Sequence, residues 1–199
     1  MALVAAIIPS VSAFVISSLY CFLNNVPFYK KNSTKSILHK ILINIRNLFI
    51  GIFATNLLYN PYSISFFPLH EELFRMLLYS LSIEFAFYWS HRFLHSNHFI
   101  YMNIHREHHL ERDPFPIDAY ILSPIESCII TASFSFPNII GIKLTQRGVI
   151  VVQTAHLVLG ILVHGAFVSI KHHMHHHKYI KGNYSGIYPL WDYVFNTRI

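Results

Sequence analysis

The sequence has few charged residues. Only 12% of its 199 residues are Asp, Glu, Lys or Arg, whereas an average soluble domain carries roughly 25%. Hydrophobic residues make up 53%, and many of them lie in long runs without charge. This composition excludes an intrinsically disordered chain, and it predicts a protein that is surrounded by lipid.

Cysteine is also scarce. Cys21 and Cys128 are the only two, and each lies in an apolar stretch, which excludes a disulfide-stapled secreted domain. The net charge of +6 is interpreted as the basic excess of cytoplasmic loops and not as a nucleic-acid-binding surface. The chain also lacks a glycine-rich dinucleotide-binding pattern and a haem-attachment signature. Any electrons that it uses must therefore come from an external donor.

Five apolar segments have about the length that a membrane span requires, roughly 20 residues. They are residues 2–23, 41–59, 74–90, 118–141 and 148–170. The first is predicted to be a retained anchor, because no basic region precedes it and no small-residue cleavage site follows it. The second contains Arg46 and three asparagines, so we expect it to be paired with other helices or partly buried among them. The last two are separated by a short turn and are expected to form a hairpin.

The loops then fall on two sides of the membrane. Segments 24–40, 91–117 and 171–199 share one side and hold eleven lysines and arginines, whereas segments 60–73 and 141–147 hold two. By the positive-inside rule the first side is cytoplasmic. The sequence thus predicts an all-α integral membrane protein of one domain, with four to five transmembrane helices and a cytosolic, histidine-rich, metal-binding cap.

Histidine is the most unusual component, with 15 residues, most of them in three clusters on the predicted cytoplasmic side. His91 and His95 are four residues apart, and His105, His108 and His109 have i, i+3, i+4 spacing. Both spacings would place the imidazoles on one face of a helix.

The third cluster, KHHMHHHKY, fits two registers. They are His172, His175 and His176, or His173, His176 and His177. Eight histidines in these three clusters are enough to give two metal ions about four nitrogen ligands each. Neutral imidazole suits zinc, copper, iron and nickel, so the spacing does not name the metal.

The stretch FAFYWSHRFLHSNHFIYMNIHREHH, followed by KHHMHHHKYIKGNYSGIYPLWDYVFNT, resembles the fatty acid hydroxylase/sterol desaturase superfamily of integral-membrane di-iron enzymes. The resemblance runs from about Lys40 to the C-terminus, so residues 1–40 are expected to form an anchor and basic loop and residues 41–199 a hydroxylase-like domain. In that family an Asn-Tyr pair follows the third histidine box after five residues, and Asn183 stands at that distance from His177. The implied metal ligands are therefore His91, His95, His105, His108, His109, His173, His176 and His177.

Further positions resemble one branch of the superfamily. Pro114 and the triplet Pro124-Ile125-Glu126 are similar to the pattern of the 4-methyl sterol oxidase and cholesterol 25-hydroxylase branch. His164-Gly165 resembles an element on the last span of that branch, which makes His164 a further candidate ligand, although it precedes His173 by fewer residues than the family usually shows. His156 is a rival for the same role, and either residue can instead be a polar packing residue between spans.

The resemblance implies a membrane di-iron oxygenase of the endoplasmic reticulum that hydroxylates or oxidises a sterol-like lipid with O₂. Its two iron ions would receive electrons from NAD(P)H through a membrane-bound b-type cytochrome or a reductase. Iron also suits the chemistry, because d¹⁰ zinc does not change oxidation state. The alternatives are a fatty-acyl hydroxylase or desaturase, and an inactive membrane protein whose histidines hold zinc structurally.

Two further sets of residues are candidates around the metal site. Four acids are available to accept hydrogen bonds from ligand histidines, namely Glu107, Glu111, Asp113 and Asp192. Six aromatic residues are candidates for lining a lipid entrance, although aromatics in spans often serve only in helix packing. They are Phe74, Phe85, Phe87, Tyr88, Phe134 and Phe136.

Overall fold

The protein is built from long helices with short helical elements beside them. The computed structural model describes residues 2–30, 36–58, 66–165 and 172–199, and every regular element within these ranges is helical, which confirms the all-α prediction. The five long helices are α1 (Ala2–Leu23), α2 (Ile37–Leu58), α3 (Leu69–Leu94), α5 (Pro124–Ile139) and α6 (Gln146–Leu162).

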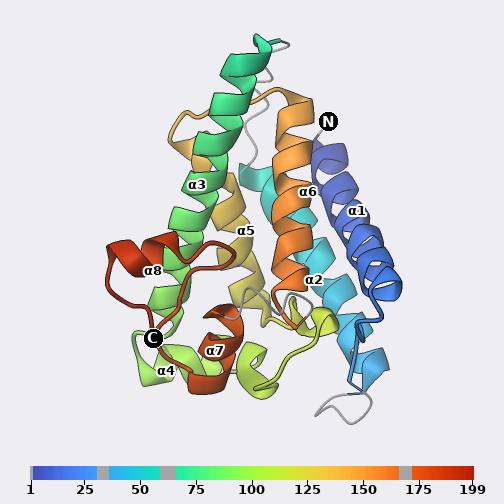
Figure 1. Cartoon of the computed structure of the whole chain (residues 1–199), viewed down its shortest axis with the longest axis vertical. Coiled ribbons are helices and arrows are strands. Elements are labelled where there is room, and N and C mark those ends of the chain that lie inside the picture. Colours follow the sequence, from blue (N-terminus) through green and yellow to red (C-terminus); the bar gives the residue numbers. More distant parts are fainter. Residues whose placement is uncertain (1, 31–35, 59–65, 166–171) are drawn as a thin grey trace.

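Short elements gather at one end of the long helices (Figure 1). They are α4 (His98–Ile100), a π-helical turn (Tyr101–His105), two 3₁₀ turns (His108–Leu110 and Pro116–Asp118), α7 (His172–Tyr179) and α8 (Leu190–Val194). We call this end the cap. The segments 91–117 and 172–199, which the sequence placed on one side, both belong to it, while the loop 140–145 lies at the opposite end (Figure 1).

The long helices lie near the five predicted spans, but their ends differ. α1 coincides with residues 2–23, α2 begins before residue 41, and α3 extends beyond 74–90 at both ends. The predicted ends at Tyr59 and Ile170 lie outside the described residues. Over the described residues, no helix is both long and apolar enough to cross a membrane. The transmembrane part of the prediction therefore stays a prediction.

Two further differences from the predicted spans lie at the start of α5 and at the end of α6. α5 begins at Pro124 and not at residue 118, because the Ser123 hydroxyl accepts a hydrogen bond from the Glu126 N–H (3.2 Å) and proline suits the first helical position. α6 ends at Leu162, followed by a turn in which Gly165 has a φ of 112°. A Cβ at this glycine would lie 2.7 Å from the Pro114 carbonyl oxygen, so only glycine fits there.

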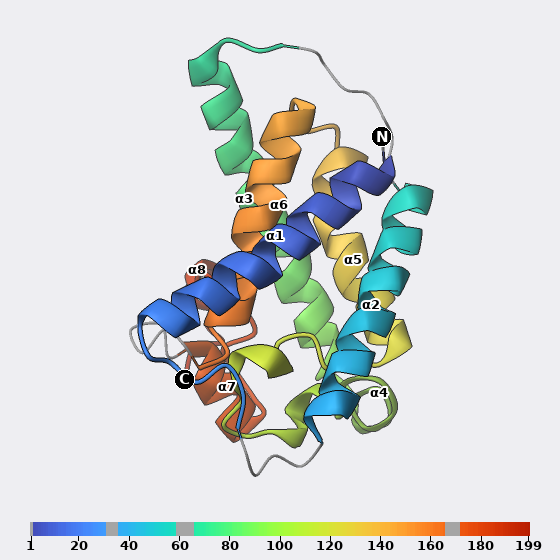
Figure 2. The same ribbon diagram turned by 90° about the vertical axis from the view of Figure 1, so that its right-hand side faces the viewer.

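Helix packing separates the two arms of the predicted hairpin. α5 and α6 are joined by the short loop 140–145, but α5 packs on α2 and α3, whereas α6 packs on α1 and α3. A buried cluster between α3 and the start of α6 anchors this arrangement; it consists of Tyr79, Ile83, Leu144, Val149 and Val152. α1 crosses the outer side of α6 at an angle (Figure 2).

The polar residues of α2 hold the loop that leads into α5. The Asn44 side chain donates to the Ile117 carbonyl (3.2 Å), and the Asn47 side chain donates to the carbonyls of Tyr120 (2.9 Å) and Leu122 (3.1 Å). Arg46 also donates to the Leu122 carbonyl. The polar side chains of this helix, which we expected to pair with other helices or to be partly buried among them, instead donate to the backbone of residues 117–122.

Candidate metal centre

The last turns of α3 bring the first two histidines to the cap. His91 is buried, and its Nδ1 lies 2.8 Å from the carbonyl oxygen of Tyr184. Since a carbonyl only accepts hydrogen bonds, Nδ1 must carry the proton. His95 follows one turn later, and its ring lies 5.2 Å from that of His91. The i, i+4 spacing therefore directs both rings to the same region, as the sequence predicted.

The second cluster is not on a regular α-helix, which corrects the expectation of a single helical face. His105 ends the π-helical turn, and His108 and His109 lie in a 3₁₀ turn. All three are buried. The neighbours His108 and His109 direct their nitrogen atoms into different groups, because adjacent residues of a helical turn do not face the same way.

The third cluster forms α7. His173, His176 and His177 are buried, whereas His175 is exposed and His172 is intermediate. The register that the family resemblance selects is therefore the one that faces the interior.

The nine candidate histidines come together in two groups. Within each group the possible ligand atoms all lie within 4.8 Å of one another. The first group contains His91, His95, His105, His109 and His176; the second contains His108, His164, His173 and His177. His164, for which the sequence left the role open, lies in the second group, and its Nε2 is 3.1 Å from that of His173. His156 is in neither group; its Nε2 lies 3.4 Å from the Ser80 hydroxyl.

Nitrogen atoms converge closely in the first group. His109 Nε2 lies 3.0 Å from His105 Nε2, 3.2 Å from His95 Nε2 and 3.2 Å from His176 Nε2. A neutral imidazole has one N–H and one lone pair, so a single nitrogen cannot satisfy three others by hydrogen bonding. This convergence is typical of ligands arranged around a cation.

Hydrogen bonds at the other ring nitrogens fix the tautomers. His105 Nδ1 lies 2.6 Å from Glu126 Oε1, His176 Nδ1 lies 2.7 Å from the Gly182 carbonyl, and His164 Nδ1 lies 2.6 Å from the Gly160 carbonyl. With the proton on Nδ1, each Nε2 offers a lone pair to the centre of its group.

Several buried nitrogens have no hydrogen-bond partner. Within the two groups they are His91 Nε2, His108 Nδ1, His109 Nδ1, His173 Nδ1 and both ring nitrogens of His177, and His172 Nε2 is a further one outside the groups. Burying a polar atom without a partner costs free energy, and a metal ion bound through one nitrogen of each ring would satisfy His91 Nε2 and one nitrogen of His177. The residues present therefore fit two adjacent metal ions, each with imidazole ligands.

Burial keeps these imidazoles neutral, which is the form that binds metal. It lowers the pKa of His91 to about 4 and that of His95 to about 3. It also lowers the pKa of His105, His173 and His177 well below the usual value, and the neighbouring imidazoles act in the same direction.

The carboxylates around the site differ from those that the sequence singled out. The direct acceptor is Glu126, which is buried and contacts His105. Asp192 supports the site indirectly. Its carboxylate accepts hydrogen bonds from the N–H groups of Tyr184 (2.7 Å) and Ser185 (2.8 Å), and these bonds position the Tyr184 carbonyl beside His91. Glu111 instead lies 3.6 Å from Lys40.

Glu84 completes the support of the C-terminal segment. Its carboxylate accepts from the N–H groups of Ile187 (3.1 Å) and Tyr188 (3.3 Å). Sequence reasoning missed this role and that of Glu126. The available signal was that both are acidic residues inside apolar runs, where a carboxylate needs a partner.

The six aromatic candidates divide into separate environments. Phe87 and Phe134 line a small chamber beside the histidines, but Tyr88 is fully buried and stacks on Phe195. Phe85 packs against Trp191 and Phe136, and Phe74 is exposed on the outer surface. Tyr88, Phe85 and Phe136 therefore take part in aromatic packing, and the lining of an entrance by the candidates stays a prediction.

At the end of this all-α body, two adjacent groups of largely buried histidines could each hold a metal ion. The comparison with known sequences names the family: the fatty acid hydroxylase family profile matches residues 76–197. This range contains all nine candidate histidines, and the chain belongs to this family.

Curated relatives agree with this assignment. Methylsterol monooxygenase 1 of Rattus norvegicus is 32% identical over 128 residues, covering 56% of this chain and 42% of the relative. Methylsterol monooxygenase 2-2 of Arabidopsis thaliana is 30% identical, covering 67% and 56%. The very-long-chain aldehyde decarbonylase CER1 of Arabidopsis thaliana is 26% identical, covering 79% and 28%. The chain thus spans about half, or less, of the length of these relatives. No solved structure matches it.

Proposed function

We propose that this protein is a membrane di-iron oxygenase that hydroxylates or oxidises a sterol-like lipid with O₂ and externally supplied electrons. The observation that carries the proposal is the pair of buried histidine groups, with Nε2 atoms converging in one and unpartnered nitrogens in both. The family and its methylsterol monooxygenase relatives support the choice of an oxidoreductase that acts on lipid.

The histidines would hold two iron ions, with His91, His95, His105, His109 and His176 on one and His108, His164, His173 and His177 on the other. Bound iron would supply the redox chemistry that oxygen insertion requires, since it can change oxidation state. The chain itself orients the imidazoles through Glu126 and the carbonyls of Tyr184, Gly182 and Gly160. NAD(P)H would provide the electrons through a membrane-bound b-type cytochrome or a reductase.

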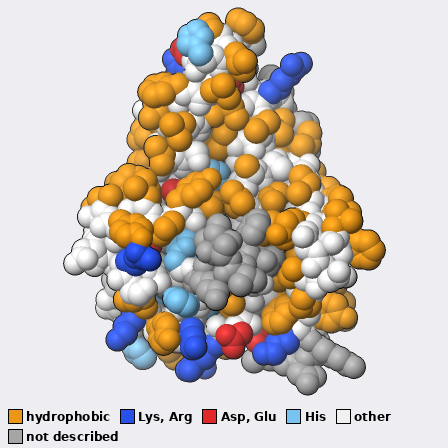
Figure 3. Space-filling model, viewed as in Figure 1, with side chains coloured by type: hydrophobic (Ala, Val, Ile, Leu, Met, Phe, Trp, Pro, Cys, Tyr) orange, Lys and Arg blue, Asp and Glu red, His pale blue; other side chains and the backbone are white. Residues whose placement is uncertain are grey.

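The outer surface supports a lipid location. Large apolar side chains are exposed along the long helices, among them Phe22 on α1, Phe49 on α2 and Phe74 on α3. On the face shown in Figure 3, apolar side chains are widespread above the cap, and charged side chains gather mainly towards the cap. Burial of apolar surface in a bilayer is favourable, so we propose that these helices lie in the endoplasmic reticulum membrane with the cap in the cytoplasm.

Lipid profiling of cells that express the protein tests this function. Cells with the wild-type protein should accumulate an oxidised sterol that is absent from cells with the His108→Ala variant. The purified protein should contain two equivalents of iron and consume O₂ when a reductase system is supplied. Stoichiometric zinc without O₂ consumption would instead indicate a structural metal protein.

The decarbonylase relatives favour a second candidate, an enzyme that acts on an aliphatic chain. Both candidates use the same metal site, so the substrate panel must decide between them. If the iron-loaded protein oxidises acyl lipids and leaves 4-methyl sterols and cholesterol unchanged, the sterol assignment is wrong.

A further inference from the structure

Two cavities lie inside the protein, one beside the histidine groups and one among the long helices, and they differ greatly in size. The chamber beside the histidines has a volume of about 60 Å³, and its walls include His91, His105, His108, His164 and His173. One water molecule needs a cavity volume of about 10 to 15 Å³. The chamber can therefore hold a few small molecules or the end of a substrate, but not the body of a lipid.

The second cavity is much larger, at about 480 Å³, within the range of typical ligand sites. It lies where α5 and α6 separate, and α1 and α2 supply its outer walls. Most of its lining is apolar, including Phe14, Leu48 and Leu157. A cavity of this size and lining suits an apolar molecule of lipid size.

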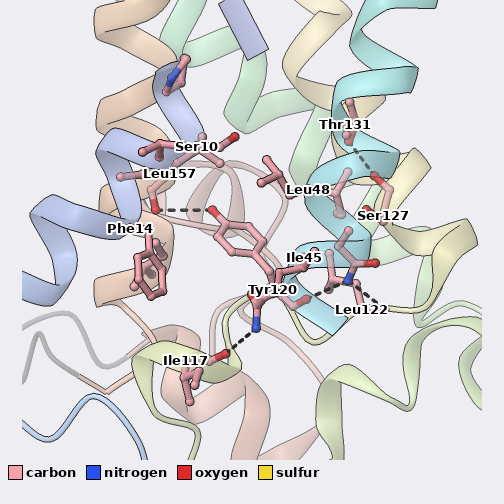
Figure 4. A pocket seen from close by; sticks show the side chains of 18 of the residues that line it. Ser10, Phe14, Ile45, Leu48, Ile117, Tyr120, Leu122, Ser127, Thr131 and Leu157 are labelled. Atoms are coloured by element: carbon pink, nitrogen blue, oxygen red, sulfur yellow. Dashed lines mark hydrogen bonds between the residues drawn. The ribbon is translucent and has the colours of Figure 1, made fainter. Parts of the chain in front are cut away.

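The two cavities share a wall. Four residues line both of them: Tyr120, Leu122, Ile130 and Phe134. Tyr120 extends its ring across the larger cavity from the loop before α5, between Leu157 on one side and Leu48 on the other (Figure 4). The boundary between the cavities thus consists of side chains, and it can be widened or narrowed by substitution.

Hydrogen bonds at the side-chain hydroxyl and at the backbone carbonyl hold Tyr120 in this position. Its hydroxyl donates to the Leu157 carbonyl (3.4 Å), and its own carbonyl accepts from the Asn47 side chain (2.9 Å). Gly160 provides the space for the hydroxyl, since a Cβ at that position would lie 3.1 Å from the Tyr120 oxygen. The ring is therefore a fixed part of the boundary, with support from α2 and α6.

We propose that the larger cavity holds the body of the lipid substrate and that Tyr120 is a specificity-determining residue at its boundary with the metal chamber. The proposal rests on the proposed function, because it takes the oxidised molecule to be a lipid. The occupant would be a lipid with a long or polycyclic apolar body in the larger cavity and its reacting end in the small chamber. A sterol and an acyl lipid both have such a body, and the experiment compares the two.

Photo-crosslinking tests the cavity without requiring turnover. Purified protein is irradiated with a diazirine-bearing sterol or, in a second arm, a diazirine-bearing fatty acid, and the labelled peptides are mapped. Labelling should fall on the wall residues of α1, α2, α5 and α6, and one of the two probes should be favoured. Labelling confined to the outer surfaces of the helices would overturn the proposal.

A matched pair of variants on α2 provides the control. Leu48 lines the cavity, whereas its neighbour Phe49 is exposed. Leu48→Trp should reduce labelling roughly tenfold, because added volume in a filled site costs binding energy, and Phe49→Trp should not. Equal bound metal in both variants shows that they are folded. Equal labelling in both folded variants would contradict the proposal.

The Tyr120 series tests specificity in the iron-loaded enzyme with its reductase system. Tyr120→Phe should retain the wild-type preference, because the ring remains. Tyr120→Ala should change the ratio of turnover on a sterol to turnover on an acyl lipid by roughly tenfold, the size of effect that one small change in a pocket produces. An unchanged ratio in Tyr120→Ala would show that Tyr120 does not set specificity.

The outcomes also separate this proposal from the proposed function. One outcome is that the probe labels the cavity, that Leu48→Trp abolishes this labelling, and that no lipid is oxidised. This outcome would support the proposed binding site and reject the proposed oxygenase activity. Lipid oxidation with labelling elsewhere would retain the oxygenase and reject this cavity as its substrate site.

Discussion

At the scale of the residue, α7 offers a direct test of which histidines bind metal. His177 is fully buried in the second group, whereas His175 on the same helix is exposed. His177→Ala should lose about half of the bound metal and all oxygenase activity, because one group loses a ligand. His175→Ala should retain both. Metal analysis of the purified variants checks this expectation, and a normal metal content in His177→Ala would exclude it as a ligand.

Glu126 allows a test of the support around the ligands. Its contact with His105 is buried, and loss of such a partner typically weakens metal affinity about 10-fold to 100-fold. We expect Glu126→Gln to show a loss in this range in a competition assay with a chelator. Glu71→Gln is the control, since Glu71 lies far along α3 and is paired with Arg75. Equal affinities in the two variants would show that Glu126 does not act through the metal site.

The residues of the candidate site could be selected from the sequence, but their grouping could not. Spacing placed His105, His108 and His109 on one face, yet His108 lies in a different group from the other two, because adjacent residues of a helical turn do not face the same way. His91 and His176 are far apart in the sequence, and tertiary packing brings their rings to 4.3 Å. Local periodicity carries no information about such contacts.

At the scale of the element, α2 is tied to the loop 117–122 by a buried ion pair. Lys40 and Asp118 are both almost fully buried and form a salt bridge. Removing one partner leaves the other charge buried, which typically costs 3 to 5 kcal/mol. Lys40→Met should therefore lower the free energy of unfolding by about 3 kcal/mol, measured by denaturant unfolding in detergent.

The exposed pair on α3 is the matched control for this measurement. Arg75 and Glu71 lie four residues apart on a helix surface, 2.8 Å from nitrogen to oxygen. Arg75→Met should cost less than about 1 kcal/mol. If both variants lose the same stability, the buried pair contributes no more than a surface pair.

The existence of the long helices followed from the sequence, while some of their ends did not. Apolar runs identified α1 and the middle of α3 correctly. The start of α5 was placed too early because residues 118–123 are apolar enough to continue a helix. The bonds that hold them as a loop come from Asn44, Arg46 and Asn47, more than 70 residues earlier.

At the scale of the whole molecule, the two ends of the helical body should face opposite sides of a membrane. Lys143 lies in the loop opposite the cap, and Ile199 ends the chain in the cap (Figure 1). In a Cys128→Ser background, Lys143→Cys and Ile199→Cys should react with a membrane-impermeant thiol reagent from opposite sides of intact microsomes. Reaction of both from the same side would refute the predicted topology.

The order of the ligand candidates along the chain also has a consequence for biosynthesis. Each histidine group includes residues of α7 (His172–Tyr179), which follows all the other members along the chain. Because ribosomes synthesise a chain from its N-terminus onwards, neither histidine group can be complete until α7 has been translated. A chain truncated before α7 would therefore lack candidate ligands in both groups.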